Sequence, residues 1–97
     1  MKKFIPFRRV AKQKTFGVCV SSNGMETAIV ANRHKKIRAV VCSNEKEAVF
    51  ARTHLNANIL CLGASLINET SALETLIAFL ETPFSGKRND IRKIKQF

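Results

Sequence analysis

The sequence predicts an α/β fold in which short buried strands alternate with helices. Three apolar runs of strand length, at residues 16–20, 37–42 and 58–62, are separated by segments with helical signals. The runs are apolar throughout rather than alternating, which is typical of parallel strands covered on both faces. Crossovers between parallel strands are right-handed. We therefore expect a three-layer doubly wound (Rossmann-like) parallel sheet, truncated to about three strands, with helical crossovers and a C-terminal helix.

The first strand and the first helix flank a short polar loop. Residues 16–20 form the strand, and the small polar residues 21–24 end it. A helix is expected over residues 25–32, and a strand rich in β-branched residues over 37–42. Ahead of the first strand, residues 8–14 are basic and only weakly helical.

Capping patterns mark the two longer helices. Asn44 with Glu47 three places on predicts an N-cap and a capping box, and this helix should run to about His54. Ser71 with Glu74 repeats the pattern before an amphipathic helix. The apolar stripe of that helix consists of Leu73, Leu76, Ile77 and Leu80.

The C-terminal segment reads as a short basic helix. Thr82 and Pro83 end the preceding helix, because proline cannot continue it. Residues 88–97 can then form a helix with Ile91 and Ile94 turned inward.

The chain length and the net charge limit the classes of function that are possible. At 97 residues, the chain fits one small domain, residues 1–97, of modest stability, for which association with another chain is a natural remedy. The formal net charge is +10, and the basic residues gather at the two ends. They include Lys2, Lys3, Arg8, Arg9, Lys12, Lys14, Lys87, Arg88, Arg92, Lys93 and Lys95. Such a pattern suits a polyanion, a phosphorylated small molecule or an acidic partner, and it also suits a plain solvated surface.

The cysteines and the N-terminus indicate a cytoplasmic protein. Cys19, Cys42 and Cys61 each lie inside an apolar run, where a thiol behaves as a small hydrophobe. Their odd number and lack of paired spacing favour a reducing compartment. Arg8 and Arg9 interrupt the start too early for a signal peptide, and no uncharged run is apolar enough to span a bilayer.

Four segments carry a family resemblance: GVCVSSNGMETAIVANR, IRAVVC, ARTHLNANILCLGA and TPFSGKRNDIRKI. In this order and spacing they resemble the second half of the ribose-5-phosphate isomerase B family, which includes the galactose-6-phosphate isomerase subunits. The most specific parts are HxNAN at residues 54–58 and the pair Arg88 and Arg92 in the setting F-x-G-x-R-x-x-x-R. The chain then divides into a basic segment, residues 1–15, and an isomerase-like region, residues 16–96.

The resemblance implies an enzyme that interconverts aldose and ketose phosphates through an enediolate. The first expected reaction is ribose 5-phosphate to ribulose 5-phosphate, a step of pentose phosphate metabolism. Such an enzyme needs a base, a group for sugar-ring opening, amides for the oxyanion and cations for the phosphate. No metal or organic cofactor is implied, because the proton moves between adjacent carbons and no metal-ligand cluster is visible. The family completes its site across a dimer interface, which implies a homodimer or pairing with a related subunit.

Several residues match the family's phosphate and ring-opening groups. Arg88 and Arg92 match its phosphate-binding arginines, and a spacing of four places both on one face of a helix. A solvated basic helix is the alternative. His54 matches the histidine associated with ring opening, and the alternative is a cap at the end of its helix. His34 is expected simply to be exposed.

The loop at residues 21–24 is the expected anion-binding element. Ser21, Ser22, Asn23 and Gly24 join a strand to a helix, where backbone N–H groups attract anions. The family usually has a catalytic cysteine at the place of Ser21, and serine is a far weaker base. Some relatives use a glutamate further along, and Glu26 lies one residue short of it. Ser21 and Glu26 are therefore both candidates for proton transfer, and Glu26 could instead only favour the helix dipole.

Three departures from the family keep other functions open. The family's first strand and its Asp-His sugar-binding turn lie upstream of the matched region, and polar family residues are replaced at Leu55 and Asn89. A truncated, non-catalytic sugar-phosphate-binding homologue, or a subunit of a hetero-oligomeric isomerase, is the alternative function. Nucleic-acid binding is disfavoured, because the chain has no Trp or Tyr and no recognised nucleic-acid motif.

Overall fold

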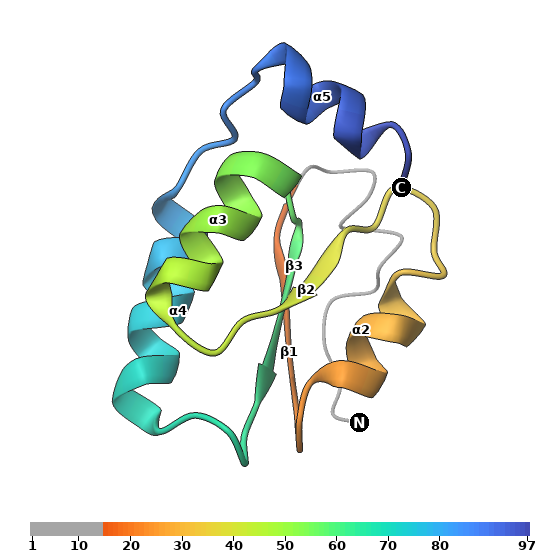
Figure 1. Ribbon diagram of the computed structural model, residues 1–97. Coiled ribbons are helices and arrows are strands. Elements are labelled where there is room, and N and C mark those ends of the chain that lie inside the picture. Colours follow the sequence, from red (N-terminus) through yellow and green to blue (C-terminus); the bar gives the residue numbers. More distant parts are fainter. Residues whose placement is uncertain (1–14) are drawn as a thin grey trace.

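The computed structural model describes residues 15–97 and contains the expected parallel sheet (Figure 1). The three strands are all parallel and lie in the order β1-β3-β2. In chain order the elements are β1 (Gly17–Ser21), α2 (Met25–Ala31), β2 (Ala39–Val41), α3 (Glu45–Leu55), β3 (Ile59–Gly63), α4 (Glu69–Glu81) and α5 (Arg88–Ile94). The weak helical expectation for residues 8–14 lies outside the described residues.

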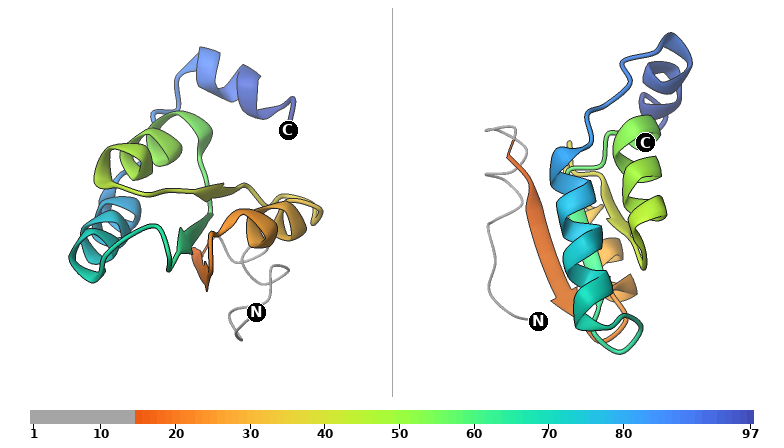
Figure 2. Two further views of the ribbon diagram at one scale, coloured as in Figure 1. Left: turned by 60° about the horizontal axis from the view of Figure 1, so that its bottom comes forward. Right: turned by 90° about the vertical axis from the view of Figure 1, so that its left-hand side faces the viewer.

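Helices cover both faces of the sheet, as the continuous apolar strands predict (Figure 2). The central strand β3 is buried at all five positions. Its side chains alternate between two cores: Ile59 and Cys61 pack toward α2, whereas Leu60 and Leu62 pack toward α3 and α4. The three-layer arrangement is confirmed.

Strand β2 is shorter than the expected run over residues 37–42, because side-chain amides bind the backbone where it begins. Asn32 Oδ1 accepts the N–H of Ala39 at 2.7 Å, and its Nδ2 donates to the Ala39 carbonyl at 2.9 Å. Asn58 Oδ1 likewise accepts the N–H of Arg38 at 2.7 Å. Side-chain amides of the two asparagines therefore bond backbone groups that a neighbouring strand would otherwise bond.

The N-cap prediction holds for α3, where the second bond of the capping box goes to the residue before the N-cap, and the prediction fails for α4. Asn44 accepts the N–H of Glu47 at 2.8 Å, whereas Glu47 reaches the N–H of Ser43 at 2.7 Å. The prediction that Ser71 caps α4 is wrong. Asn68 is the N-cap, and its side chain accepts the N–H of Ser71 at 2.8 Å. An asparagine side chain can bond a backbone N–H of the first turn that has no partner within the helix, so α4 begins after Asn68 and not after Ser71.

Two expected inward faces are buried only in part, because Leu76 of α4 packs against the core and Ile94 of α5 is half-buried while their neighbours on the same faces are exposed. The stripe residues Leu73, Ile77 and Leu80 of α4 are 58%, 46% and 50% exposed, since the helix buries another face. That buried face consists of Thr75, Ala78 and Phe79. In α5 the expected inward Ile91 is exposed, and Asp90 is buried instead because it is hydrogen-bonded there.

The three cysteines are buried, which confirms their role as small hydrophobes. Burial raises the pKa of Cys42 and of Cys61 to about 12, and it also raises the pKa of Cys19. Among residues 15–97 there is no helix with the length and apolar character needed to cross a membrane.

A buried arginine joins the ends of three elements. Arg52 is 6% exposed, and its guanidinium donates to the carbonyl oxygens of Ala57 at 2.6 Å and of Thr82 at 3.0 Å. The Phe16 ring lies 4.6 Å from its Cζ. The guanidinium therefore connects the end of α3 to the start of β3 and the end of α4.

We expect Arg52→Met to lower the free energy of unfolding by about 3 kcal/mol, because it removes the donor from the buried carbonyl oxygen of Ala57 and from the partly buried one of Thr82. Urea unfolding measures the change. Arg33→Met, on an exposed turn, is the control and should change stability by less than about 0.5 kcal/mol. Equal effects of the two substitutions would contradict the structural role of Arg52.

Candidate functional site

The loop between β1 and α2 forms the first part of the candidate site. Gly24 caps α2 with a φ of 78°, which glycine adopts without steric cost. The backbone N–H groups of Ala64 and Ser65 donate to the carbonyl oxygens of Ser21 and Ser22 at 2.7 and 2.9 Å. The residues that follow β3 therefore hold this loop in place.

Ser21 serves as a hydrogen-bond acceptor within the loop. Its Oγ accepts the N–H of Gly24 at 3.1 Å and the hydroxyl of Thr27 at 3.0 Å. Because a hydroxyl has two lone pairs and one hydrogen, both acceptor positions are occupied. Ser21 can still donate its hydrogen to an oxyanion, but it is poorly suited to receive a proton.

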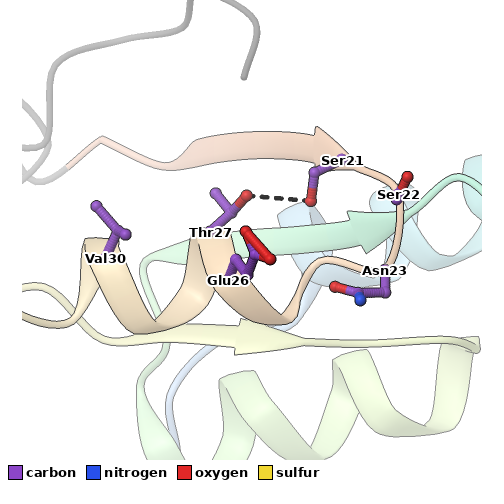
Figure 3. A pocket seen from close by; sticks show the side chains of 6 residues that line it. All are labelled: Ser21, Ser22, Asn23, Glu26, Thr27 and Val30. Atoms are coloured by element: carbon purple, nitrogen blue, oxygen red, sulfur yellow. Dashed lines mark hydrogen bonds between the residues drawn. The ribbon is translucent and has the colours of Figure 1, made fainter.

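A pocket of about 360 Å³ opens beside the loop (Figure 3). It is lined by Ser21, Ser22, Asn23, Glu26, Thr27 and Val30. Glu26 is exposed, and it lines the pocket together with Ser21 and Thr27. The arrangement places a carboxylate that can accept a proton beside a hydroxyl that can donate a hydrogen bond.

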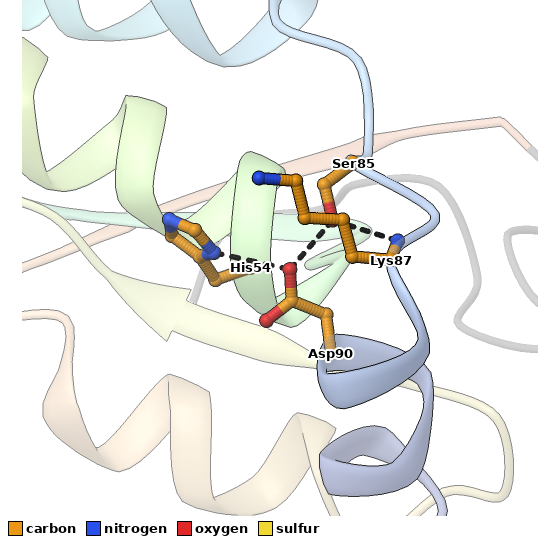
Figure 4. Close-up of polar contacts among 4 residues, drawn as sticks. All are labelled: His54, Ser85, Lys87 and Asp90. Carbon is orange, nitrogen blue, oxygen red and sulfur yellow. Dashed lines mark hydrogen bonds and ion pairs between the residues drawn. The ribbon is translucent and has the colours of Figure 1, made fainter.

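The second part of the candidate site lies where α3 meets α5 (Figure 4). His54 is in the last turn of α3, and its Nδ1 lies 3.1 Å from Asp90 Oδ2. The Ser85 hydroxyl donates to the same oxygen at 2.5 Å. The hydrogen bond from Ser85, and after it the one from His54, hold the pKa of Asp90 below its usual range. Asn56, with φ 49°, is the C-cap of α3, so His54 does not have the alternative role of a cap.

The arginines occupy the same end of the molecule as His54 but another side of α5. Arg88 and Arg92 are both exposed and lie four residues apart on the helix. Asp90 is two residues from each, which turns it about half a revolution away from them. Asp90 therefore faces α3 while the two guanidinium groups leave α5 on its outer side.

The two parts of the candidate site lie at opposite ends of the sheet (Figure 1). Ser21 ends β1, and Asn44 at the start of α3 follows the matching end of β2. Helix α3 then runs back along the sheet for 11 residues, about 16 Å, before it reaches His54. A single chain therefore brings Ser21, Asn23 and Glu26 together, and separately brings His54 to the end that carries the arginines.

The sequence analysis did not single out Asp90, Ser85 or Thr27. The only acidic residue after Glu81 is Asp90, and an isolated acid in a basic segment was a signal that could have drawn attention to it. In the HxNAN segment, Asn56 and Asn58 have structural roles, since they end α3 and bind the backbone before β2. His34 is exposed, as expected.

The fold and the two polar clusters define a doubly wound α/β protein with groups suited to an anionic, hydroxyl-bearing ligand. The chain belongs to the family described as Ribose/Galactose Isomerase, because the family model matches residues 7–97. This confirms the resemblance seen in the sequence.

Curated relatives agree with the family assignment. A putative sugar phosphate isomerase of Rickettsia bellii is 35% identical over 86 residues, which cover 89% of this chain and 60% of that protein. A probable ribose-5-phosphate isomerase B of Mycoplasma genitalium is 32% identical over 81% of this chain and 52% of its own length. The chain thus spans between half and two thirds of the length of the relatives that it matches.

Solved structures show the same fold. The type B ribose 5-phosphate isomerase of Trypanosoma cruzi superposes with a TM-score of 0.89 at 34% identity, over 93% of this chain and 61% of that one. The ribose 5-phosphate isomerase of Thermotoga maritima gives 0.87 at 36% identity, over 93% and 62%. Both comparisons support the parallel arrangement described above.

The position of the loop depends on a close approach to Gly63. A Cβ at Gly63 would lie 2.8 Å from the carbonyl carbon and oxygen of Asn23. We therefore expect Gly63→Ala to cost about 2 kcal/mol of stability and to shift backbone amide resonances of residues 21–24. Urea unfolding and amide spectra measure the two effects.

Gly86→Ala is the matched control. Its Cβ would meet nothing within 4 Å, and its φ of 69° adds only a conformational cost, about 1 kcal/mol. If Gly63→Ala left the amides of residues 21–24 in place, the contact would not position the loop.

Proposed function

We propose that this chain acts in the aldose–ketose isomerisation of a sugar phosphate, with ribose 5-phosphate and ribulose 5-phosphate as the first pair to test. The observation that carries the proposal is the membership of the family together with two polar clusters, one able to transfer a proton and one basic. A cytoplasmic location and a place in pentose phosphate metabolism stay predictions.

At the loop, we assign proton transfer to Glu26 and hydrogen bonding to Ser21. An enediolate forms when a base removes the proton from the carbon beside the carbonyl, and the same group can return it to the neighbouring carbon. Glu26 supplies a carboxylate at the pocket. Ser21, which already accepts two hydrogen bonds, is left with a hydrogen for the developing oxyanion. Ser22, Asn23 and Gly24 contribute the backbone of this anion-binding loop.

At the other end, we assign phosphate binding to Arg88 and Arg92 and ring opening to His54. A planar guanidinium matches the geometry of phosphate oxygens, and both arginines are exposed for such contacts. His54 is partly exposed and can exchange a proton with a sugar hydroxyl.

The separation of these two ends supports a site shared between chains. A sugar phosphate is too short to span a helix of 11 residues, so one copy cannot place both ends on the same ligand. A symmetric homodimer, in which the loop of one copy meets the histidine end of its partner, would supply both. Pairing with a related isomerase subunit is the other possible assembly.

A non-catalytic sugar-phosphate-binding protein, or a subunit of a larger isomerase, is the second candidate. Two observations favour it. The lone pairs of Ser21 are occupied where the family usually has a cysteine. The arginines also leave α5 on the side away from His54, which suits binding without turnover.

The first test of the function is phosphate binding. We expect Arg88→Ala and Arg92→Ala each to weaken the binding of ribose 5-phosphate about tenfold, because each removes a charge-assisted hydrogen bond. Isothermal titration calorimetry at constant salt measures the affinity.

Lys93→Ala removes the same charge from the same helix but points about 100° away from Arg92, and it should leave the affinity nearly unchanged. Arg88→Lys keeps the charge and loses the planar fork, and it should resemble Arg88→Ala. Equal weakening by Lys93→Ala would indicate general attraction and not a phosphate site.

The second test is proton transfer. Proton NMR in heavy water should show deuterium entering ribose 5-phosphate beside the carbonyl, and Glu26→Gln should slow this at least about a hundredfold. A folded chain that binds the sugar phosphate without any exchange would exclude isomerisation by this chain alone and support the binding or subunit alternative.

A mixed dimer tests whether the site is shared. Glu26→Gln and His54→Gln should each be nearly inactive, whereas refolding them together in equal amounts should restore about a quarter of the wild-type exchange rate, since half the dimers then hold one intact site. A mixture no faster than the separate variants would show that each site is built from one chain.

A further inference from the structure

The carboxylate of Asp90 is placed as a partner for one nitrogen of His54. Its side chain is 8% exposed, and its Oδ2 lies within hydrogen-bond distance of both His54 Nδ1 and Ser85 Oγ. Within the basic segment that follows Glu81 it is the single acidic residue. A buried carboxylate is retained only where hydrogen bonds compensate its lost hydration, and here one of the two bonds comes from the histidine.

This contact determines which nitrogen of the neutral imidazole carries the proton. An ionised carboxylate can only accept hydrogen bonds, so the hydrogen must lie on His54 Nδ1. The pKa of Asp90, lowered by Ser85 and then by His54, keeps the carboxylate ionised at neutral pH. The Nε2 atom is then left with a lone pair, on the side of the ring away from Asp90 (Figure 4).

The surrounding contacts fix the direction of the ring. The Phe50 ring lies beside the imidazole, with centroids 4.8 Å apart. Ser85 is itself held, because its N–H donates to the Thr53 carbonyl at 3.0 Å and its Oγ accepts the N–H of Lys87 at 3.1 Å. The carboxylate therefore has a defined position relative to α3, and His54 with it.

We propose that Asp90 is a positioning residue for His54: it holds the imidazole with its proton on Nδ1 and so presents Nε2 as the proton acceptor toward a bound sugar. The assignment rests on the proposed function. In ring opening, Nε2 takes the proton of the anomeric hydroxyl, the bond between the anomeric carbon and the ring oxygen breaks, and the proton passes to that oxygen. His54 ends neutral, and Asp90 balances the imidazolium in between.

A purely structural role, in which Asp90 only docks α5 onto α3, gives different results. Docking requires only that a hydrogen bond forms, so an asparagine could replace the aspartate without loss of function. The amide of asparagine can donate to Nδ1 and so permits the other tautomer. The tautomer of His54 therefore tests the assignment of the hydrogen bond, and the exchange rate of an Asp90→Asn variant in which α5 stays docked separates positioning from docking.

The test is a long-range ¹H–¹⁵N correlation spectrum of the labelled full chain, at a pH where both histidines are neutral, with His54→Gln to assign the signals. We expect a protonated Nδ1 and an unprotonated Nε2 in the unchanged chain. In Asp90→Asn this preference should be lost, whereas Ser85→Ala should keep it. Backbone amide spectra show whether α5 stays docked. A protonated Nε2 in the unchanged chain overturns the proposal, even if Asp90→Asn fails to fold.

The rate of deuterium exchange tests whether Asp90 contributes to the reaction. With ribose 5-phosphate, Asp90→Asn should lower the deuterium-exchange rate about tenfold or more and leave the affinity for the sugar phosphate unchanged. An unchanged rate in a folded Asp90→Asn variant overturns the proposal. If Arg88→Ala and the unchanged chain bind the sugar phosphate equally poorly, the proposed function fails, whereas the tautomer measurement needs no ligand and still tests the contact between Asp90 and His54.

Discussion

The guanidinium of Arg52 is the interaction on which the arrangement of the histidine end depends. A charge taken out of water is costly, and here carbonyl oxygens and aromatic rings, rather than a carboxylate, compensate it. Because these carbonyls belong to the start of β3 and the end of α4, the bonds fix where α3 stops relative to both. His54 lies two residues further on, so its position follows from this buried charge. The segment that leads to α5 starts at Thr82, one of the same anchors.

The sequence predicted the layered arrangement of strands and helices better than it predicted which face of each helix is buried. Apolar runs reveal strands that are buried on both faces, and β3 is the plainest case. The stripe on α4 had the spacing of a core face, but Thr75 and Phe79 are buried instead, because a helix next to a small three-stranded sheet can bury only one side. In α5, the apolar spacing predicted the isoleucines as the inward residues. Hydrogen bonds from His54 and Ser85 favour Asp90 there, and such partners cannot be read from spacing.

The candidate site, too, could be predicted from the sequence only in part. The resemblance named the loop and the basic helix as two segments of the candidate site, but it could not place them relative to each other. In a parallel α/β unit, a helix that follows a strand carries the chain back to the opposite end of the sheet, where the next strand begins. Polar groups at a strand end and at the following helix end are therefore on opposite sides of the molecule. The hydroxyl of Ser21 shows a further limit, because only the structure reveals that its lone pairs are occupied.

The buried thiols make the chain convenient for distance measurements. Cys19, Cys42 and Cys61 are buried, and thiols with a pKa near 12, as for the latter two, remain protonated at neutral pH. A single cysteine introduced on the surface would therefore be the one group that takes up a fluorophore or spin label under mild conditions. Labels near the loop or near α5 would report separations between copies without first removing native cysteines from the core.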